Sequence, residues 1–484
     1  MDLVIPKIDV VSLGPELILS ITAMLVLLVG AFLPKGKKDP AAYLSILGIL
    51  FAFLSAICLW GNPRYAFNNM ILVDNFSLFF NTIFLIAAGL TILMSVNYLK
   101  EEEMDHGEFY ALILFATVGM MFMAIGSNLI TIFLGLETMS ISIYVLAGFL
   151  RKSNKSNESA LKYLLLGAFS SAFLLYGIAM IYGATGTTDL KGIAEHLSKA
   201  AFLKDPMLLA GIGLLIVGFG FKIASVPFHM WTPDVYEGAP TSVTAFMSVG
   251  VKAAAFAAFV RVFLYSLWEL QPDWNLVLWI SAVLTMTLGN IVAISQNNIK
   301  RMLAYSSIAH AGYIMVGMVA SNELGISSIL FYLLAYAFMN LGAFAVIILY
   351  GRKGEENLDI NNYAGMGFKY PALALLMSVF IFSLAGIPPT AGFVAKFYIF
   401  SAAIKSGYIW LAIIGVMNSL VSVYYYLRVT VMMYMNEPVK DFPGLKWTPS
   451  MAIALIIAVI GTLLIGLFPS PYLEMARQSV QLFM

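Results

Sequence analysis

The sequence predicts an all-α integral membrane protein of about fourteen transmembrane helices, and two observations carry this prediction. Of its 484 residues, 61% are hydrophobic and only 11% are charged, which is far from the composition of a soluble domain. Apolar runs of about 20 residues recur from end to end, without the alternation that transmembrane strands show. No polar block is long enough for a soluble domain, so we expect residues 1–484 to form a single membrane domain.

The apolar runs place each span to within about four residues. The first run lacks a basic leading region and is expected to stay as a span rather than be cleaved as a signal. After the sixth span, residues 184–206 predict an amphipathic segment lying on the outer surface of the membrane. The spans are expected near 13–33, 41–60, 71–98, 109–126, 129–150, 160–182, 207–226, 240–266, 275–296, 302–320, 325–350, 371–403, 409–434 and 449–469.

The distribution of lysine and arginine predicts the orientation of the chain. Alternate loops, including those with Arg151, Lys152, Lys300 and Arg301, hold roughly fourteen basic residues, whereas the other loops hold roughly seven. The richer set is expected on the cytoplasmic side. Both termini are therefore predicted on the outer side, which requires an even number of spans.

Charged residues within the spans point to a proton or cation pathway. Lys222, Lys252 and Lys396 lie too deep to reach the headgroups easily, and a lysine at the centre of a span costs roughly 2.5–3.5 kcal/mol to insert. Glu137 is the one carboxylate in the middle of a span, and a neighbouring lysine favours its charged form. We therefore expect Glu137 to pair with one of the lysines, and the pair to load and release protons as it opens and closes.

Other basic residues within the spans have two interpretations each. Lys162 begins the sixth span beside a basic loop, and either faces Glu137 or belongs to the surface. His310 either relays protons, because imidazole titrates near neutral pH, or is a hydrogen-bonded core residue. Arg261 and Arg428 lie near span ends, where a long side chain can reach the headgroups as an interfacial anchor.

Prolines interrupt the seventh and twelfth spans. Pro227 breaks the seventh, and Pro388 with Pro389 breaks the twelfth, because proline removes a backbone donor and clashes with the preceding turn. The freed carbonyls must face protein or a wet cavity, since lipid cannot satisfy them. Breaks five spans apart predict two inverted repeats, 109–266 (spans 4–8) and 275–434 (spans 9–13), in which Lys222 corresponds to Lys396.

Several kinds of site are not expected on this chain. Its single cysteine, Cys58, rules out a cysteine-ligated iron–sulfur cluster or an internal disulfide. The four histidines are scattered, and no nucleotide-binding or metalloprotease motif is present. We expect no cofactor, metal ion or nucleic acid to be bound here.

Four motifs resemble those of the antiporter-like membrane subunits of respiratory complex I. They are LGLETMSIS, SVPFHMWTPDVYEGAPT, KRMLAYSSIAHAGY and AGIPPTAGFVAKF, and the resemblance spans roughly residues 10–470. It implies a proton-translocating, non-redox subunit of NADH-quinone oxidoreductase that couples quinone reduction elsewhere to proton transfer. Under it, Glu137 and Lys222 are the proton-transferring pair, Lys252 the connecting lysine and Lys396 the lysine toward the outer exit. His310 matches a polar position less firmly.

The resemblance also implies partners and a location. FMN, iron–sulfur clusters and quinone are expected in partner subunits, and neighbours include antiporter-like subunit M and small subunits such as K. The chain is expected in the lipid bilayer of a bacterial inner membrane.

Two alternatives stay open. A subunit of a cation/proton antiporter shares the fold, although three deep lysines against one deep carboxylate disfavour a Na⁺ site, which needs oxygen ligands. A scaffold that only holds neighbouring subunits would tolerate methionine at the lysines.

Overall fold

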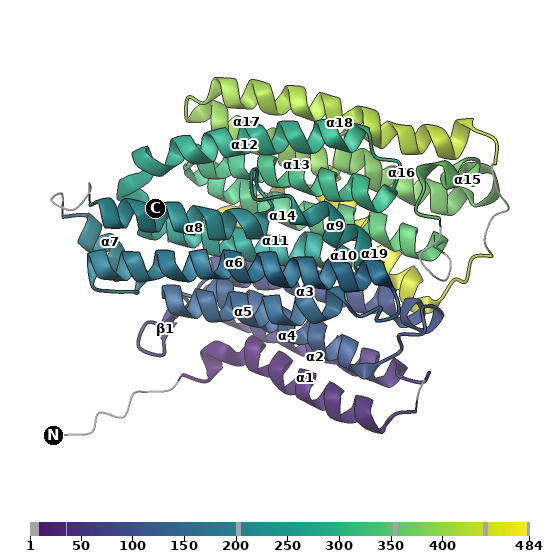
Figure 1. The fold of residues 1–484 in the computed structure, drawn as a ribbon, viewed down its shortest axis with the longest axis horizontal. Helices are drawn as coiled ribbons and strands as arrows, with labels where there is room; N and C mark the ends of the chain where they lie inside the picture. Colours follow the sequence, from purple (N-terminus) through teal and green to yellow (C-terminus); the bar gives the residue numbers. More distant parts are fainter. Residues whose placement is uncertain (1–8, 35, 200–204, 352–356, 439–443, 482–484) are drawn as a thin grey trace.

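The computed structural model describes residues 9–34, 36–199, 205–351, 357–438 and 444–481. Its helices run side by side along one direction and form a bundle (Figure 1). The short helix α7 (Leu190–Leu197) and strand β1 (Arg64–Ala66) lie at one end of the bundle, and α15 (Met366–Lys369) lies at the other. The predicted all-α membrane fold is confirmed.

Within the described residues, thirteen helical segments are long and apolar enough to cross a membrane. The one remaining predicted span, the twelfth, is present as two helices of 15 residues, each too short by itself: α16 (Pro371–Ala385) and α17 (Ala391–Lys405). The thirteen are α1 (Gly14–Phe32, preceded by η1, Val11–Leu13), α2 (Asp39–Leu59), α3 (Asn75–Glu101), α4 (Gly107–Ile125), α5 (Leu129–Ala147), α6 (Asn154–Thr185), α8 (Pro206–Ile223), Thr241–Ser266, α12 (Gln271–Ile294, with η5, Trp268–Leu270), α13 (Ile299–Ala320), α14 (Glu323–Tyr350), α18 (Ile409–Met435) and α19 (Pro449–Leu467).

The eighth span, Thr241–Ser266, alternates between two helix types. It consists of α10 (Thr241–Phe246), the π-helical η3 (Met247–Val251), α11 (Lys252–Val260) and the π-helical η4 (Arg261–Ser266). Both π-helical segments directly adjoin a basic residue, since Lys252 follows one and Arg261 begins the other. Such widened turns occur often at functional sites.

The remaining elements are short. The amphipathic segment predicted over residues 184–206 contains α7, whose apolar side chains Leu190, Ile193 and Leu197 are buried; its residues 200–204 lie outside the described part of the chain. Strand β1 pairs antiparallel with β2 (Ile71–Val73). The others are α9 (Trp231–Gly238), η6 (Ile360–Tyr363) and α20 (Ser470–Ser479).

One helix boundary differs from the sequence prediction by more than the expected margin. The apolar run predicts that the sixth span begins near residue 160, but α6 begins at Asn154, capped by the Ser153 hydroxyl, which accepts from the Ser156 N–H. The first turns of α6 are polar, so the apolar pattern could not reveal them. They carry Lys155, Glu158 and Lys162 to one end of the bundle.

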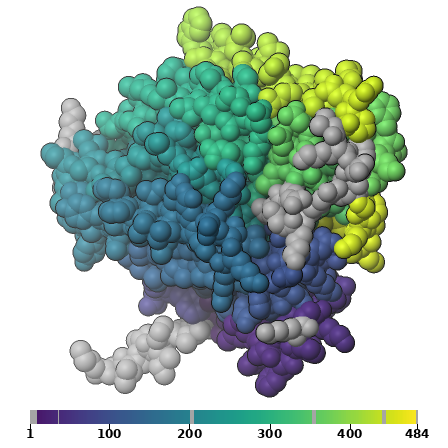
Figure 2. All heavy atoms as spheres, turned by 45° about the vertical axis from the view of Figure 1, so that its right-hand side comes forward, coloured from purple at the N-terminus to yellow at the C-terminus, as the bar shows by residue number. Residues whose placement is uncertain are grey.

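The centre of the bundle is formed by α10, α11, α13 and α14. Every residue of α10 and α11 is buried, and α14 packs against α3, α16, α17 and α19. By contrast, α6, α12 and α18 expose many large apolar side chains, as helices that face lipid do. In Figure 2 the first helices (purple) lie at the bottom, and C-terminal segments (yellow) lie at the upper right and lower on the right-hand side. The C-terminal helices α19 and α20 pack against α3.

Candidate functional site

The first buried lysine stands at the end of α8. Lys222 occupies the last turn of this helix, two residues before Ala224, whose left-handed backbone conformation ends the helix. Its ammonium donates to the Ser140 hydroxyl at 2.8 Å and the Tyr144 hydroxyl at 3.5 Å, both on α5. The aromatic rings of Tyr144, Tyr163 and Phe221 lie between 5.6 and 5.7 Å from the same nitrogen. Hydroxyls and ring faces thus surround Lys222.

Glu137 lies on the same helix as Ser140, one turn earlier. Its carboxylate accepts a hydrogen bond of 2.5 Å from Ser171 on α6. Among the described residues no ion pair of 4.0 Å or less joins Glu137 to Lys222, but the two charges interact electrostatically between α5 and α8. Each makes its own serine contact, and the opening and closing of the two as a pair stays a prediction. Glu137 is only half-buried in the isolated chain, next to the exposed Leu134. A neighbouring molecule or lipid must cover this side of α5.

Lys252 lies at the start of α11 and reaches across to α13. Its ammonium donates to both the carbonyl and the hydroxyl of Ser307, the latter at 2.5 Å. Exposed fractions of 1%, 2% and 5% for Lys222, Lys252 and Lys396 confirm that all three lysines are buried. Lys252 thus connects the eighth span to α13, the helix that also carries His310, while α11 itself packs against α8.

His310, one turn after Ser307 on α13, bridges two tyrosines. Its Nδ1 lies 2.6 Å from the Tyr332 hydroxyl, and its Nε2 lies 3.1 Å from the Tyr426 hydroxyl. Tyr426 also shares a hydrogen bond with Ser306. In neutral imidazole one nitrogen donates and the other accepts, so exchanging the tautomer moves a proton from one tyrosine side to the other.

Lys396 belongs to α17 and folds back over the second break. Its ammonium donates to the carbonyls of Leu384 (3.1 Å) and Ala385 (2.9 Å) at the end of α16, and to the Ser419 hydroxyl (2.9 Å). It also lies 5.0 Å from the ring centre of Tyr313, which meets His310 edge-on. The lysine is therefore adjacent to the histidine and its tyrosines.

The two breaks surround the prolines predicted to cause them. Between α8 and α9, residues 224–230 contain Pro227; between α16 and α17, residues 386–390 contain Pro388 and Pro389. The polar stretch after Pro227 becomes helical again at Trp231, where α9 begins. The sequence did not predict this short helix.

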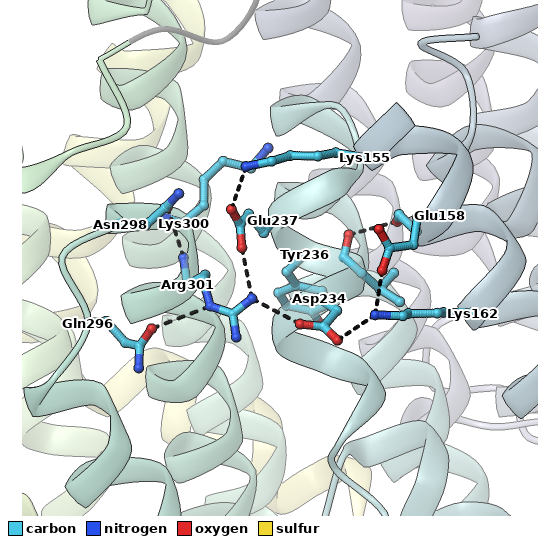
Figure 3. A network of polar contacts seen from close by, with 12 residues as sticks. Lys155, Glu158, Lys162, Asp234, Tyr236, Glu237, Gln296, Asn298, Lys300 and Arg301 are labelled. Carbon is cyan, nitrogen blue, oxygen red and sulfur yellow. Dashed lines mark hydrogen bonds and ion pairs between the residues drawn. The ribbon is translucent and has the colours of Figure 1, made fainter. Parts of the chain in front are cut away.

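Lys162 does not contact Glu137. It pairs with Glu158 at 2.6 Å and with Asp234 of α9 at 2.9 Å. Arg301 bonds Asp234 at 2.9 Å and Glu237 at 2.8 Å, and Lys155 bonds Glu237 at 2.9 Å (Figure 3). These six residues, which we term the ion network, lie at the end of the bundle that carries the basic loops.

The ion network holds both of its α9 carboxylates in the charged form. Partial burial raises the pKa of Asp234, but hydrogen bonds from Lys162 and Arg301 outweigh burial and lower the pKa below its ordinary value of 3.8. The same balance, with Arg301 and Lys155 as donors, lowers the pKa of Glu237 below 4.5. Neither carboxylate is protonated at neutral pH.

Arg261 is not an interfacial anchor, contrary to the expectation from its place near a span end. It is 3% exposed, and its guanidinium binds both carboxylate oxygens of Asp74, at 3.1 and 2.8 Å, and the carbonyl of Ala124 at 3.0 Å. The partner follows β2, far away in the sequence. Arg428 is half-buried and donates to the carbonyls of Ile294 and Gln296.

Comparison with known proteins places this geometry in a family. The family model described as "NADH:quinone oxidoreductase/Mrp antiporter, TM" matches residues 126–422, more than half of the chain and all of the predicted proton-transfer residues. The chain belongs to this family. NADH-quinone oxidoreductase subunit N of Trichlorobacter lovleyi is 56% identical over 468 residues, which cover 97% of this chain and 96% of the relative.

Solved structures agree with this membership of the NADH:quinone oxidoreductase/Mrp antiporter family. A chain of respiratory complex I from Thermus thermophilus with bound aureothin is 35% identical, with a TM-score of 0.82 over 95% of this chain and 98% of that one. A chain of the Mrp complex from Dietzia has a TM-score of 0.86 over 98% of both chains, but at 20% identity it shows only the shared fold.

Sequence reasoning found the charged residues of this family member but missed the hydroxyls between them. Ser140 and Ser307 each lie three residues from a predicted site residue on the same helix, so helical spacing was a usable signal. Tyr332 and Tyr426, on α14 and α18, offered no such signal, because only the packing brings them to His310.

Proposed function

We propose that this chain is a proton-translocating, non-redox membrane subunit of NADH-quinone oxidoreductase. Protons would pass between Glu137, Lys222, Lys252, His310 and Lys396, with Lys162 near the entrance. The observation that supports this most is that each of the three buried ammonium groups donates to a hydroxyl, and none of them forms an ion pair with a carboxylate within the described part of the chain. A hydroxyl both donates and accepts, and lysine, unlike arginine, can give up its proton when buried.

Electron transfer is assigned to partner subunits in this proposal. FMN, iron–sulfur clusters and quinone would belong to them, and neighbours would include antiporter-like subunit M and small subunit K. The half-buried Glu137 on an otherwise exposed face of α5 supports a polar neighbour there. The chain would lie in a bacterial inner membrane with both termini on the periplasmic side, as its basic loops predict.

Alternating access would follow from the two inverted repeats, 109–266 and 275–434. Each contains one interrupted span, and the polar line between Lys222 and Lys396 passes through α11 and α13, which belong to different repeats. A proton taken up through one repeat would be released through the other. Redox energy would act by changing the contacts along this line.

Replacing Lys252 by methionine tests the proposal, with Lys38→Met as a matched control. Lys38 is also buried and donates to two backbone carbonyls, of Gly30 and Leu33, but it lies outside the polar line. In membrane vesicles, Lys252→Met should lower NADH-driven proton uptake about tenfold, equivalent to about 1.4 kcal/mol, whereas Lys38→Met should retain it. Normal pumping by an assembled Lys252→Met complex would contradict the proposal and favour a scaffold.

The antiporter alternative makes a different prediction for the purified chain. Sodium-driven proton exchange by this chain alone in liposomes, without flavin or iron–sulfur partners, would favour the alternative.

A further inference from the structure

The short helix α9 is held between two long helices by charge and by backbone contacts. Its carboxylates Asp234 and Glu237 bond cations of both α6 and α13 within the ion network. The Ser159 hydroxyl of α6 donates to the Val235 carbonyl at 2.9 Å. Figure 3 shows the two carboxylates of α9 lying between the α6 lysines and Arg301 of α13. This helix lies between the break that ends the seventh span and the start of the eighth span.

The same helix begins with Trp231, which stacks on two of the rings that lie beside Lys222. The rings of Trp231 and Tyr163 stack at 4.5 Å with an interplanar angle of 9°, and Phe221 stacks on Trp231 at 5.1 Å. Trp231 also donates to the Phe221 carbonyl at 3.0 Å. Tyr163 directly follows Lys162 of the ion network, while its ring lies 5.7 Å from the Lys222 ammonium. The stack therefore separates the network from the first buried lysine.

The hydroxyl of Tyr163 lacks a hydrogen-bond partner among the described residues. The side chain is fully buried, and an unsatisfied buried hydroxyl costs free energy that a water molecule would recover. Separating the Trp231 and Tyr163 rings would admit that water and connect it toward Lys222.

We propose that α9 is a gate at the entrance of the first half of the pathway. The stacked Trp231 and Tyr163 form its barrier, and the ion network is the latch that keeps it shut. Irregular residues 224–230 precede α9 and Ala239 and Pro240 follow it, so the helix can tilt as a unit. The gate rests on the proposed proton pathway, and adds to it the residues that control access to Lys222.

Removing the barrier should make the membrane leak protons. In vesicles without NADH, Trp231→Ala should raise the decay rate of an imposed pH gradient severalfold, and Trp231→Phe should not. Adding Lys222→Met to Trp231→Ala should return the rate to the wild-type value, because the leak runs through Lys222. Trp268→Ala is the control, since Trp268 is half-exposed in η5 at the end of the eighth span. An assembled Trp231→Ala complex with wild-type decay would overturn the gate.

Releasing the latch should expose the space around Lys222, and this test does not need Trp231 to be changed. Ser140→Cys, in a chain with Cys58→Ser, places a thiol where the Ser140 hydroxyl meets Lys222. Asp234→Asn with Glu237→Gln should speed its reaction with a membrane-impermeant thiol reagent severalfold, read as labelling of this subunit. Glu195→Gln, which removes a surface ion pair with Lys191 on α7, should leave the rate unchanged. Equal labelling rates in the Asp234→Asn, Glu237→Gln variant and in the Glu195→Gln control would overturn the proposal.

The two proposals fail separately. Normal pumping by Lys222→Met would remove the pathway itself. Blocked pumping by Lys222→Met, together with an unchanged leak and unchanged labelling, would remove only the gate.

Discussion

The two interrupted spans hold their lysines in different ways. Lys222 precedes its break, and its hydrogen bonds within the described part of the chain go to side chains of α5, the Ser140 and Tyr144 hydroxyls. Lys396 follows its break and turns back to the Leu384 and Ala385 carbonyls. One sequence signature, an apolar helix with prolines and a lysine, has thus produced two electrostatic surroundings. A hydroxyl can exchange a proton with its lysine, whereas a carbonyl can only accept a hydrogen bond from it.

The backbone closes both helix ends in the same way, so the difference between the breaks lies in where the lysine stands. At the end of α8, the N–H groups of Ala224 and Ser225 bond the Gly220 carbonyl, and that of Ala224 also bonds the Phe221 carbonyl. At the end of α16, Gly386 and Ile387 bond the carbonyls of Phe382 and Ser383. The next two carbonyls, of Leu384 and Ala385, remain for Lys396, at the negative end of the helix dipole.

The largest expected effect is at the first break. Lys222→Met removes the group that exchanges protons with the α5 hydroxyls, so proton pumping should fall about tenfold or more, with NADH oxidation falling alongside it because the two are coupled. The measurement is the proton-to-electron ratio and the turnover rate in vesicles, on complexes shown by native gels to be assembled. A normal ratio would show that Lys222 is not on the pathway.

At the second break, a substitution of Lys396 can distinguish the effect of its positive charge from its ability to release a proton. Lys396→Arg keeps the positive charge beside the Leu384 and Ala385 carbonyls, so assembly should be unchanged, but guanidinium cannot release a proton. Pumping should therefore fall severalfold, as far as in Lys396→Met. Pumping at the wild-type rate in Lys396→Arg would mean that the lysine only neutralises the carbonyls.

Replacing a glycine by alanine tests how tightly each interrupted span is packed. A Cβ at Gly392, the second residue of α17, would lie 1.8 Å from the Ser383 carbonyl oxygen, so Gly392→Ala must push the two halves of the twelfth span apart. We expect a loss of about 1–3 kcal/mol in stability, seen as a lower unfolding temperature of the assembled complex. Gly213→Ala, in the open part of α8, should be neutral or slightly stabilising. Equal unfolding temperatures for the two variants would contradict this packing.

The smallest effect concerns pH at the ion network beside the first break. Because the folded pKa values of Asp234 and Glu237 lie below 3.8 and 4.5, their stabilisation of α9 is complete above those ordinary values and is lost as pH falls through the lowered ones. Because the thiolate is the reactive form, the measurement is a ratio of labelling rates at equal pH: Ser140→Cys with the ion network intact, divided by Ser140→Cys with Asp234→Asn and Glu237→Gln. This ratio should be constant between neutral pH and about 5 and should rise below about 4.5. A ratio that stays constant at low pH would contradict the role of these carboxylates.

The sequence predicted features that depend on single segments. Apolar length predicted the spans, proline predicted the interruptions, and the cost of a charge in lipid identified the three lysines. Contacts between segments that are distant in the sequence could not be predicted from it. Arg261 was misjudged because Asp74 lies 187 residues earlier, and Lys162 was left open because its partner Asp234 is brought to it only by α9. The serines beside Glu137 and Lys222 look like ordinary helix residues until the helices pack.

The pair of Asp74 and Arg261 bears on how the chain is made. Asp74 caps α3, accepting from the Ser77 N–H at 2.8 Å, and is 1% exposed. Leaving such a carboxylate without its cation costs about 3–5 kcal/mol. During synthesis Asp74 leaves the ribosome long before Arg261. The ion pair that stabilises the start of the third span can therefore form only after the eighth span has been inserted. A chain truncated before Arg261 leaves this buried carboxylate without its cation, so the third span of such a chain is less stable by this amount.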